Sequence, residues 1–107
     1  MSGIEKRGDD FEKRFALDEG LRFKATARRN KLLGQWAAEK LGKSGDEAEA
    51  YAKSIVMADF EEAGDDDVFR KVRKDFDGAN VAQSDHQIRR TMDELMVTAI
   101  DQIKAGK

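Results

Sequence analysis

The sequence predicts an all-α fold: a four-helix bundle preceded by a flexible N-terminal arm. The chain of 107 residues contains no proline, 39% charged residues and only 7% aromatic residues. This mixture is typical of helices with solvated outer faces. Apolar residues recur every three to four positions in separate segments, and short stretches containing glycine or serine divide these segments. A chain of this length forms one hydrophobic core.

The arm is predicted over residues 1–19 and the bundle over residues 20–107. Residues 1 to about 10 are polar and contain glycine, a composition typical of disordered segments. Phe11 and Phe15 then follow one helical turn apart, in a stretch full of charge. Acidic residues four positions before basic ones favour a helix here, but Gly20 costs roughly 0.8–1.0 kcal/mol relative to alanine. Because so short a helix is marginal in water, the arm is expected to be helical when docked and frayed when free.

The first bundle helix is predicted from about Leu21 to Leu41, with Gly42 as its stop signal. Its apolar face follows helical spacing and consists of Leu32, Leu33, Trp36, Ala37 and Leu41. A capping box of Ser44 and Glu47 predicts that the second helix starts near Gly45, and Gly64 is expected to end it. The apolar side of this second helix consists of Ala48, Tyr51, Ala52, Ile55, Val56 and Phe60.

The third helix is predicted after Asp65, Asp66 and Asp67, because the helix macrodipole favours negative charge at an N-terminus. It carries Val68, Phe69, Val72 and Phe76 and stops at the sequence DGAN, with Gly78 as the expected C-cap. A second capping box, Ser84 with Gln87, predicts the start of the fourth helix. The apolar residues of the fourth helix are Ile88, Met92, Leu95, Met96, Ala99 and Ile103.

Composition excludes several classes of function. The formal net charge of −2 argues against non-specific nucleic-acid binding, which needs a strong basic surplus. The chain has no cysteine, which excludes disulfides, thiol catalysis and thiolate metal sites. The first ten residues contain no apolar run, so we expect no signal peptide and no membrane insertion. A cytoplasmic protein is therefore expected.

Two motif-like strings do not support the chemistry that they suggest. AAEKLGKS resembles a phosphate-binding P-loop, but Ala37 stands where the first glycine belongs, and a helix rather than a strand precedes it. DFDGAN resembles a calcium loop, but its alignment puts Arg73 and Ser84 at positions that require an acid. His86 is the only histidine and lies beside a helix cap, which favours a surface position. We therefore expect neither a metal site nor an enzyme.

A basic stretch on the first bundle helix has two interpretations. Lys24, Arg28, Arg29 and Lys31 precede Trp36 by one to three turns. They could form a solvated face, the usual role of a charge run. Alternatively, they could form an anion or nucleotide site, with the basic groups on phosphate and an aromatic ring near the base. Trp36 shares a face with the leucines of this helix, which favours core packing over stacking on a ligand.

The two phenylalanines of the arm also have two interpretations. Phe11 and Phe15 could anchor a helix in a groove on another protein. Alternatively, the arm could extend the first bundle helix and place both rings over the core. The pattern of residues alone does not decide between these interpretations.

A resemblance to a known family bears on both questions. RRNKLLGQWAAEKLG (residues 28–42) and ADFEEAG (residues 58–64) are unusual strings, not generic amphipathic patterns. They lie in longer runs that resemble the alpha-proteobacterial zeta subunit family, the inhibitor of the F1F0-ATP synthase. The resemblance extends from Phe11 to the fourth helix. It implies a four-helix bundle whose N-terminal segment is mobile when free and helical when inserted in F1. The insertion site is a catalytic interface between alpha and beta subunits, next to the gamma stalk, where the helix blocks ATP-hydrolysing rotation.

The resemblance implies a partner and a ligand, and the residues that contact them are assigned here from the arm and from the basic stretch. The residues expected to bind F1 are Phe11, Arg14, Phe15, Asp18, Glu19 and Arg22. ADP or ATP is expected as a regulatory ligand, with Arg28, Arg29 and Lys31 as the contacts. No cofactor is required, and neither nucleic acid nor membrane insertion is expected. The protein should be monomeric when free, cytoplasmic, and peripheral to the membrane-bound ATP synthase.

Gly20 departs from the family pattern, in which alanine or another helix former is usual at this position. A glycine at the junction of arm and bundle weakens helix propagation. Two functions therefore stay open. The first is a regulatory inhibitor of the rotary ATPase that acts through its arm. The second is a nucleotide-binding bundle that associates with F1 and inhibits it weakly or not at all.

Overall fold

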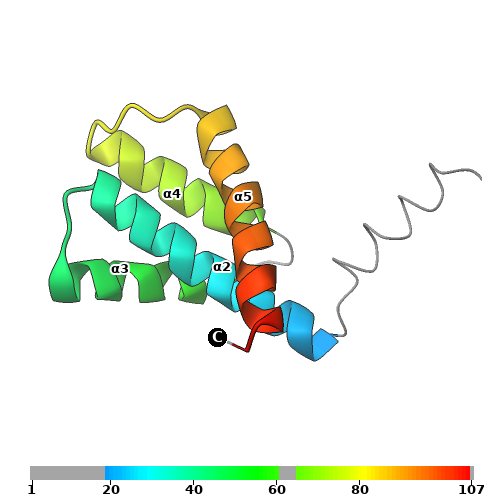
Figure 1. The fold of residues 1–107 in the computed structure, drawn as a ribbon. Helices are drawn as coiled ribbons and strands as arrows, with labels where there is room; N and C mark the ends of the chain where they lie inside the picture. The colour runs from blue at the N-terminus through cyan, green and yellow to red at the C-terminus, as the bar shows by residue number, and fades with distance from the viewer. Residues whose placement is uncertain (1–18, 61–64, 107) are drawn as a thin grey trace, which may run out of the picture.

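A computed structural model describes residues 19–60 and 65–106. Within these ranges the chain forms four α-helices (Figure 1): α2 (Glu19–Lys40), α3 (Gly45–Ala58), α4 (Asp66–Gly78) and α5 (Asp85–Lys104). The predicted all-α fold with four bundle helices is confirmed. The predicted boundary between arm and bundle stays a prediction, because residues 1–18 lie outside the described residues.

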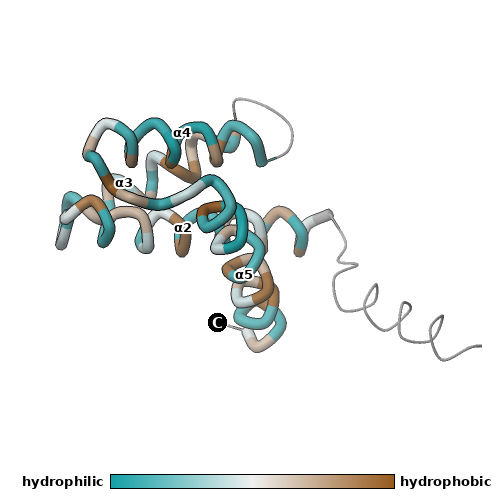
Figure 2. The backbone as a smooth tube through the Cα atoms, turned by 90° about the horizontal axis from the view of Figure 1, so that it is seen from above, coloured by the Kyte–Doolittle hydropathy of each residue, from teal (hydrophilic) through white to brown (hydrophobic). Residues whose placement is uncertain are grey.

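Helix α2 is the central element of the bundle. It packs most extensively against α3 and α5, while α4 completes the bundle through α3 and α5. Figure 1 shows α2 between α3 and α4, with α5 crossing near the end where α2 begins. Hydrophobic positions alternate with hydrophilic ones along each helix (Figure 2), which is the pattern of helices that bury one face.

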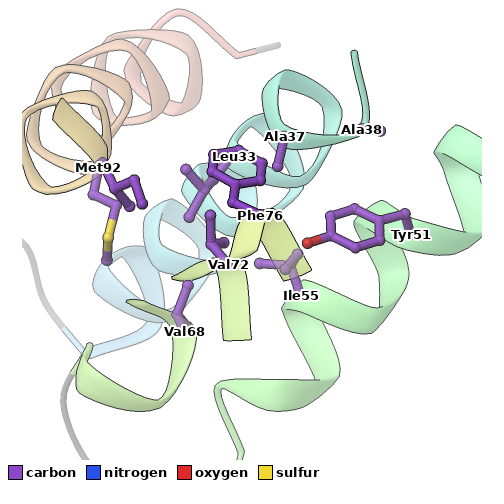
Figure 3. Close-up of a cluster of buried hydrophobic side chains, with 10 residues drawn as sticks. Leu33, Ala37, Ala38, Tyr51, Ile55, Val68, Val72, Phe76 and Met92 are labelled. Carbon is purple, nitrogen blue, oxygen red and sulfur yellow. The ribbon is translucent and has the colours of Figure 1, made fainter. Parts of the chain in front are cut away.

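The core consists of side chains from all four helices (Figure 3). Its buried members are Leu33, Ala37, Ala38, Tyr51, Ile55, Val68, Val72, Phe76, Ile88 and Met92. Trp36 is half-buried and packs against this cluster, with its ring centroid 5.6 Å from that of Phe76. The predicted core role of Trp36 is therefore confirmed. Among residues 19–60 and 65–106, every buried member of the cluster lies between Leu33 and Met92, so all four helices share this core.

The second bundle helix differs from its prediction at both ends. Ser44 is its N-cap, but the Ser44 hydroxyl makes no capping hydrogen bond, so the predicted capping box with Glu47 is wrong. The physical reason is the first residue of the helix, Gly45, whose left-handed φ of 57° departs from the helical geometry that a capping box requires. Helix α3 ends at Ala58 and not near Gly64, and Phe60 is consequently exposed.

The end of α4 also corrects a prediction. Gly78 is the last helical residue, and the left-handed position belongs to Asn80, with a φ of 58°. There the N–H of Val81 donates to the carbonyl of Phe76 at 2.9 Å, and the N–H of Asn80 donates to that of Asp77 at 3.3 Å. These two bonds define a Schellman motif, in which asparagine is the second choice after glycine.

Two other predicted helix signals are confirmed. Gly42 ends α2 in the same kind of motif, with a φ of 77° and a 2.8 Å bond from the N–H of Lys43 to the carbonyl of Ala38. At the start of α5, the N–H of Gln87 donates to the Ser84 hydroxyl at 3.1 Å. In return, the N–H of Ser84 donates to the Gln87 side chain at 2.8 Å. Both capping-box bonds are present.

Gly34 sets how closely α2 approaches α3. A Cβ atom added to Gly34 would lie 2.5 Å from the Cα of Ala52 and 3.0 Å from its Cβ. We expect Gly34→Ala to destabilise the protein by about 1–3 kcal/mol, because the two helices must move apart. This loss outweighs the roughly 1 kcal/mol that alanine gains over glycine in a helix.

Urea denaturation measures the effect of Gly34→Ala, and Gly20→Ala is its matched control. Gly20 also lies in α2 but is exposed, so this control should lose no stability. A Gly34→Ala variant as stable as the unmodified protein would contradict the proposed close approach of the two helices.

Candidate functional site

A groove lies at one end of the bundle, where the first half of α2 meets the C-terminal end of α5 and Val56 of α3. Its volume is about 630 Å³, and it is lined by Leu21, Phe23, Lys24, Ala27, Arg28, Lys31, Val56, Ile103 and Gly106. Apolar side chains and three basic residues thus share one hollow. Such a surface suits a ligand or partner that combines an apolar part with negative charge.

Two of the three predicted nucleotide contacts line this groove. Arg28 is half-buried, and its Nη1 donates to Oε1 of Gln102 at 2.7 Å, which fastens α2 to α5. Lys31 is exposed and also lines an adjoining hollow of about 370 Å³ beside Val56 and Met57. The structure therefore brings Arg28 and Lys31 together, one turn apart, on the same apolar groove.

The third predicted contact, Arg29, lies inside the bundle. Its side chain is 2% exposed, and its Nη2 lies 2.6 Å from Oδ1 of Asp65, whose side chain is 47% exposed. Its Nε donates to Oδ1 of Asn30 at 2.7 Å, and Nδ2 of Asn30 donates to Oδ2 of Asp59 at 3.0 Å. This polar network ties α2 to the end of α3 and to the start of α4. A nucleotide contact by Arg29 stays a prediction, and the burial of its guanidinium disfavours that role.

Helical spacing distinguishes Arg29 from its basic neighbours. Arg29 stands four positions before Leu33 and seven before Trp36, which places it on the inward face of α2. Arg28 and Lys31 are three positions apart, so they lie together on another side of the helix. The composition of the basic stretch does not distinguish the buried Arg29 from Arg28 and Lys31, but the helical period of about 3.6 residues does.

The carboxyl group of Asp59 in this network has a pKa above its ordinary value. Partial burial raises the pKa of Asp59, as do the charges of Asp67 and Asp65, while the hydrogen bond from Asn30 and the charge of Arg29 oppose the rise. The folded protein thus holds this proton more tightly than the unfolded chain. Ionised Asp59 therefore lowers stability at a pH above its folded pKa, and the loss disappears below its unfolded pKa.

We expect Asp59→Asn to raise the unfolding midpoint at pH 7 and to lose this advantage at about pH 3, where aspartate is protonated in both states. The asparagine oxygen can still accept the hydrogen bond from Asn30. Thermal unfolding at the two pH values measures the difference, with Asp93→Asn on an exposed position of α5 as the control. A gain at pH 3 equal to that at pH 7 would exclude ionisation of Asp59 as the cause.

Most of the residues predicted to bind F1 lie outside the described residues, namely Phe11, Arg14, Phe15 and Asp18. Glu19 and Arg22 lie in α2, and Arg22 is exposed. Their roles stay predictions. Phe23 follows them in α2 and is exposed although it is aromatic. It is a candidate that the predicted set did not include.

Among residues 19–60 and 65–106, no group of three or more His, Cys, Asp or Glu side chains is placed to hold a metal ion. His86 is exposed in the first turn of α5, as predicted. None of the described helices combines the length and the apolar character needed to cross a membrane.

The chain is thus a small helical bundle that carries a mixed apolar and basic groove. The chain belongs to the ATPase inhibitor subunit zeta family, which it matches over residues 1–102. It is also similar to a protein known from a solution NMR structure, with 52% sequence identity and a TM-score of 0.72. That match covers 81% of this chain and 99% of the other. No curated protein matches. The family consists of inhibitor subunits, so the chain is not a catalytic enzyme.

Proposed function

We propose that the chain inhibits ATP hydrolysis by the F1 part of the ATP synthase by inserting its arm as a helix. The insertion site is a catalytic interface between alpha and beta subunits, next to the gamma stalk. The observation that carries the proposal is that every buried hydrophobic residue of the described chain lies between Ala25 and Ile100. The described helices thus share a core of their own, as the proposal requires if Phe11 and Phe15 are to bind a partner.

Helix α2 supports the proposed mode of insertion. Glu19 and Gly20 are already helical, so an arm helix can continue α2 without a change of direction. Phe11 and Phe15 would then fill apolar pockets in the interface, and Arg14, Asp18, Glu19 and Arg22 would provide polar contacts around them. An interface held in one shape by such a helix cannot pass through the changes that hydrolysis requires, and rotation stops.

The test is the rate of ATP hydrolysis by the cognate F1 as the intact chain is added, together with the amount of chain bound. Binding with a saturating loss of rate is the expected result. Binding without loss of rate would favour the second candidate described next. Absence of binding would contradict both candidates.

The second candidate is a bundle that binds adenine nucleotide, associates with F1 and inhibits it weakly or not at all. The groove favours this candidate, because Arg28 and Lys31 lie beside exposed Phe23. The basic groups would contact phosphate, and the ring would stack on the base. Gly20 also favours it, because a glycine weakens the helix that the arm must form.

If ADP occupies the groove, Lys31→Glu should weaken its binding at least tenfold, since an attractive phosphate contact becomes a repulsive one. The fold should be retained because Lys31 is exposed. Isothermal titration with ADP measures the affinity. Lys40→Glu, at an exposed position in the last turn of the same helix, is the matched control. Equal affinities in the two variants would exclude the groove as the site.

A further inference from the structure

Four large apolar side chains are exposed near the start of α2 and the end of α3. They are Leu21, Phe23, Met57 and Phe60, with exposed fractions of 37%, 62%, 65% and 64%. The rings of Phe23 and Phe60 touch, with centroids 6.3 Å apart, so α2 and the residues after α3 form one continuous surface. We refer to these four residues as the aromatic patch. Contiguous exposed apolar side chains on a highly charged chain mark a site of interaction.

The aromatic patch lies beside the point where the arm joins the bundle. Leu21 and Phe23 are in the first described turns of α2, and the start of α2 (blue in Figure 1) extends beyond α3 and α5. Phe23 follows Phe15 by eight residues. In a continuous helix this separation is about 12 Å. A protein that encloses Phe15 is therefore close enough to contact Phe23.

We propose that the aromatic patch is a second docking surface for F1, at the rim of the interface that accepts the arm. This inference rests on the proposed function. Lys24 and Lys31 line the adjoining groove, so the complementary surface of F1 is apolar and flanked by acidic side chains. The arm and the aromatic patch thus bind one partner side by side, with the arm inside the interface and the patch at its mouth.

The size of the patch favours F1 over a second copy of the chain, and the test below distinguishes F1 from the chain's own arm. A second copy of the chain would need a larger surface. The four side chains expose on the order of 450 Å². A standard stable interface buries about 800 Å² on each partner. A patch of this size suits an added contact to a partner that the arm already holds.

The test compares the affinity for F1 of the full chain and of the double variant Phe23→Ser with Phe60→Ser. Its matched control is Gln35→Ser with Lys40→Ser, which truncates two exposed side chains of α2 outside the patch. We expect the patch variant to bind F1 at least tenfold more weakly, chiefly through faster dissociation. Its unfolding midpoint should equal that of the control. Met57→Ser alone is the milder variant and should also weaken binding to F1, by less than the double variant does. Affinities within twofold of the unmodified chain for both variants would overturn the inference.

Two further measurements distinguish the causes of failure. Phe11→Ala with Phe15→Ala is assayed in parallel: if it weakens binding and the patch variants do not, only the second surface is wrong. If neither set weakens binding, the proposed function fails as well. Ring resonances of Phe23 and Phe60 in the free chain should not change with the arm variant or with protein concentration. A change with the arm variant would make the arm the occupant, and a change with concentration would make it a second copy; either would overturn the inference.

Discussion

Replacing both Phe11 and Phe15 by alanine is expected to abolish inhibition of F1 ATP hydrolysis, while the free energy of unfolding changes by less than about 0.5 kcal/mol. Aromatic anchors in partner pockets carry a large share of the binding energy. The concentration of chain needed for half-maximal inhibition should therefore rise by roughly two orders of magnitude or more when both rings are lost. The stability of the free protein should not change, because the buried core is built from the bundle helices. Hydrolysis rates and urea denaturation measure the two effects on the same samples.

Phe69→Ala is the control that should behave in the opposite way. Phe69 is half-buried on α4, and the Arg89 guanidinium lies 3.9 Å from its ring centroid. Its removal should lower stability and leave inhibition intact.

Gly20→Ala should strengthen inhibition by up to roughly fivefold, because it removes a helix cost of about 1 kcal/mol at a position that is already helical. Full inhibition by the Phe11→Ala with Phe15→Ala variant would contradict the helix-in-groove mechanism.

Arg29→Glu is expected to destabilise the bundle by about 3–5 kcal/mol, enough to unfold much of a small domain. The substitution would bury a negative charge where the Arg29 guanidinium now lies 2.6 Å from Asp65. Asp59 and Asp67 lie in the same region, and their charges already interact. The new carboxylate would therefore meet like charges, and Asn30 would lose the guanidinium to which its oxygen is bonded.

Urea denaturation of Arg29→Glu tests this role, with Lys31→Glu as the matched charge reversal on the same helix. Lys31 is exposed, so its reversal should cost less than about 0.5 kcal/mol. Asp65→Asn should have an intermediate effect, because the Asp65 side chain is 47% exposed and its amide can still accept a hydrogen bond. Equal stability of Arg29→Glu and Lys31→Glu would contradict the structural role of Arg29.

Local signals in the sequence predicted two helix ends correctly, whereas the capping box at Ser44 and the cap at Gly78 were wrong. The Ser84 and Gln87 capping box and the glycine stop at Gly42 both form as predicted, because each depends on residues within a few positions. The end of α3 was not predictable in this way. The run up to Gly64 keeps a helical pattern, but α3 ends at Ala58. Directly after this end, Asp59 accepts a hydrogen bond from Asn30 of α2. Such a contact between residues distant in the chain cannot be predicted from sequence spacing.

The same limit applies to the candidate site. A basic run on one helix predicted a positively charged region, and Arg28 and Lys31 do line one groove. Arg29 belongs to a different environment because one residue along a helix turns the side chain by about 100°. Phe60 was predicted to be part of a buried face, yet it lies beyond the end of α3 and is exposed against Phe23. Only the packed helices reveal that these two rings form one surface.

The most direct test of the central claim compares the rate of ATP hydrolysis by F1 in the presence of the intact chain and of residues 19–107. The described helices should retain cooperative unfolding in the shorter chain, because their buried core lies between Leu33 and Met92. We predict that the intact chain lowers the rate to a saturating limit and that the shorter chain, although folded, leaves it unchanged at the same concentrations. Equal inhibition by the two chains would contradict the claim that the N-terminal arm inhibits F1.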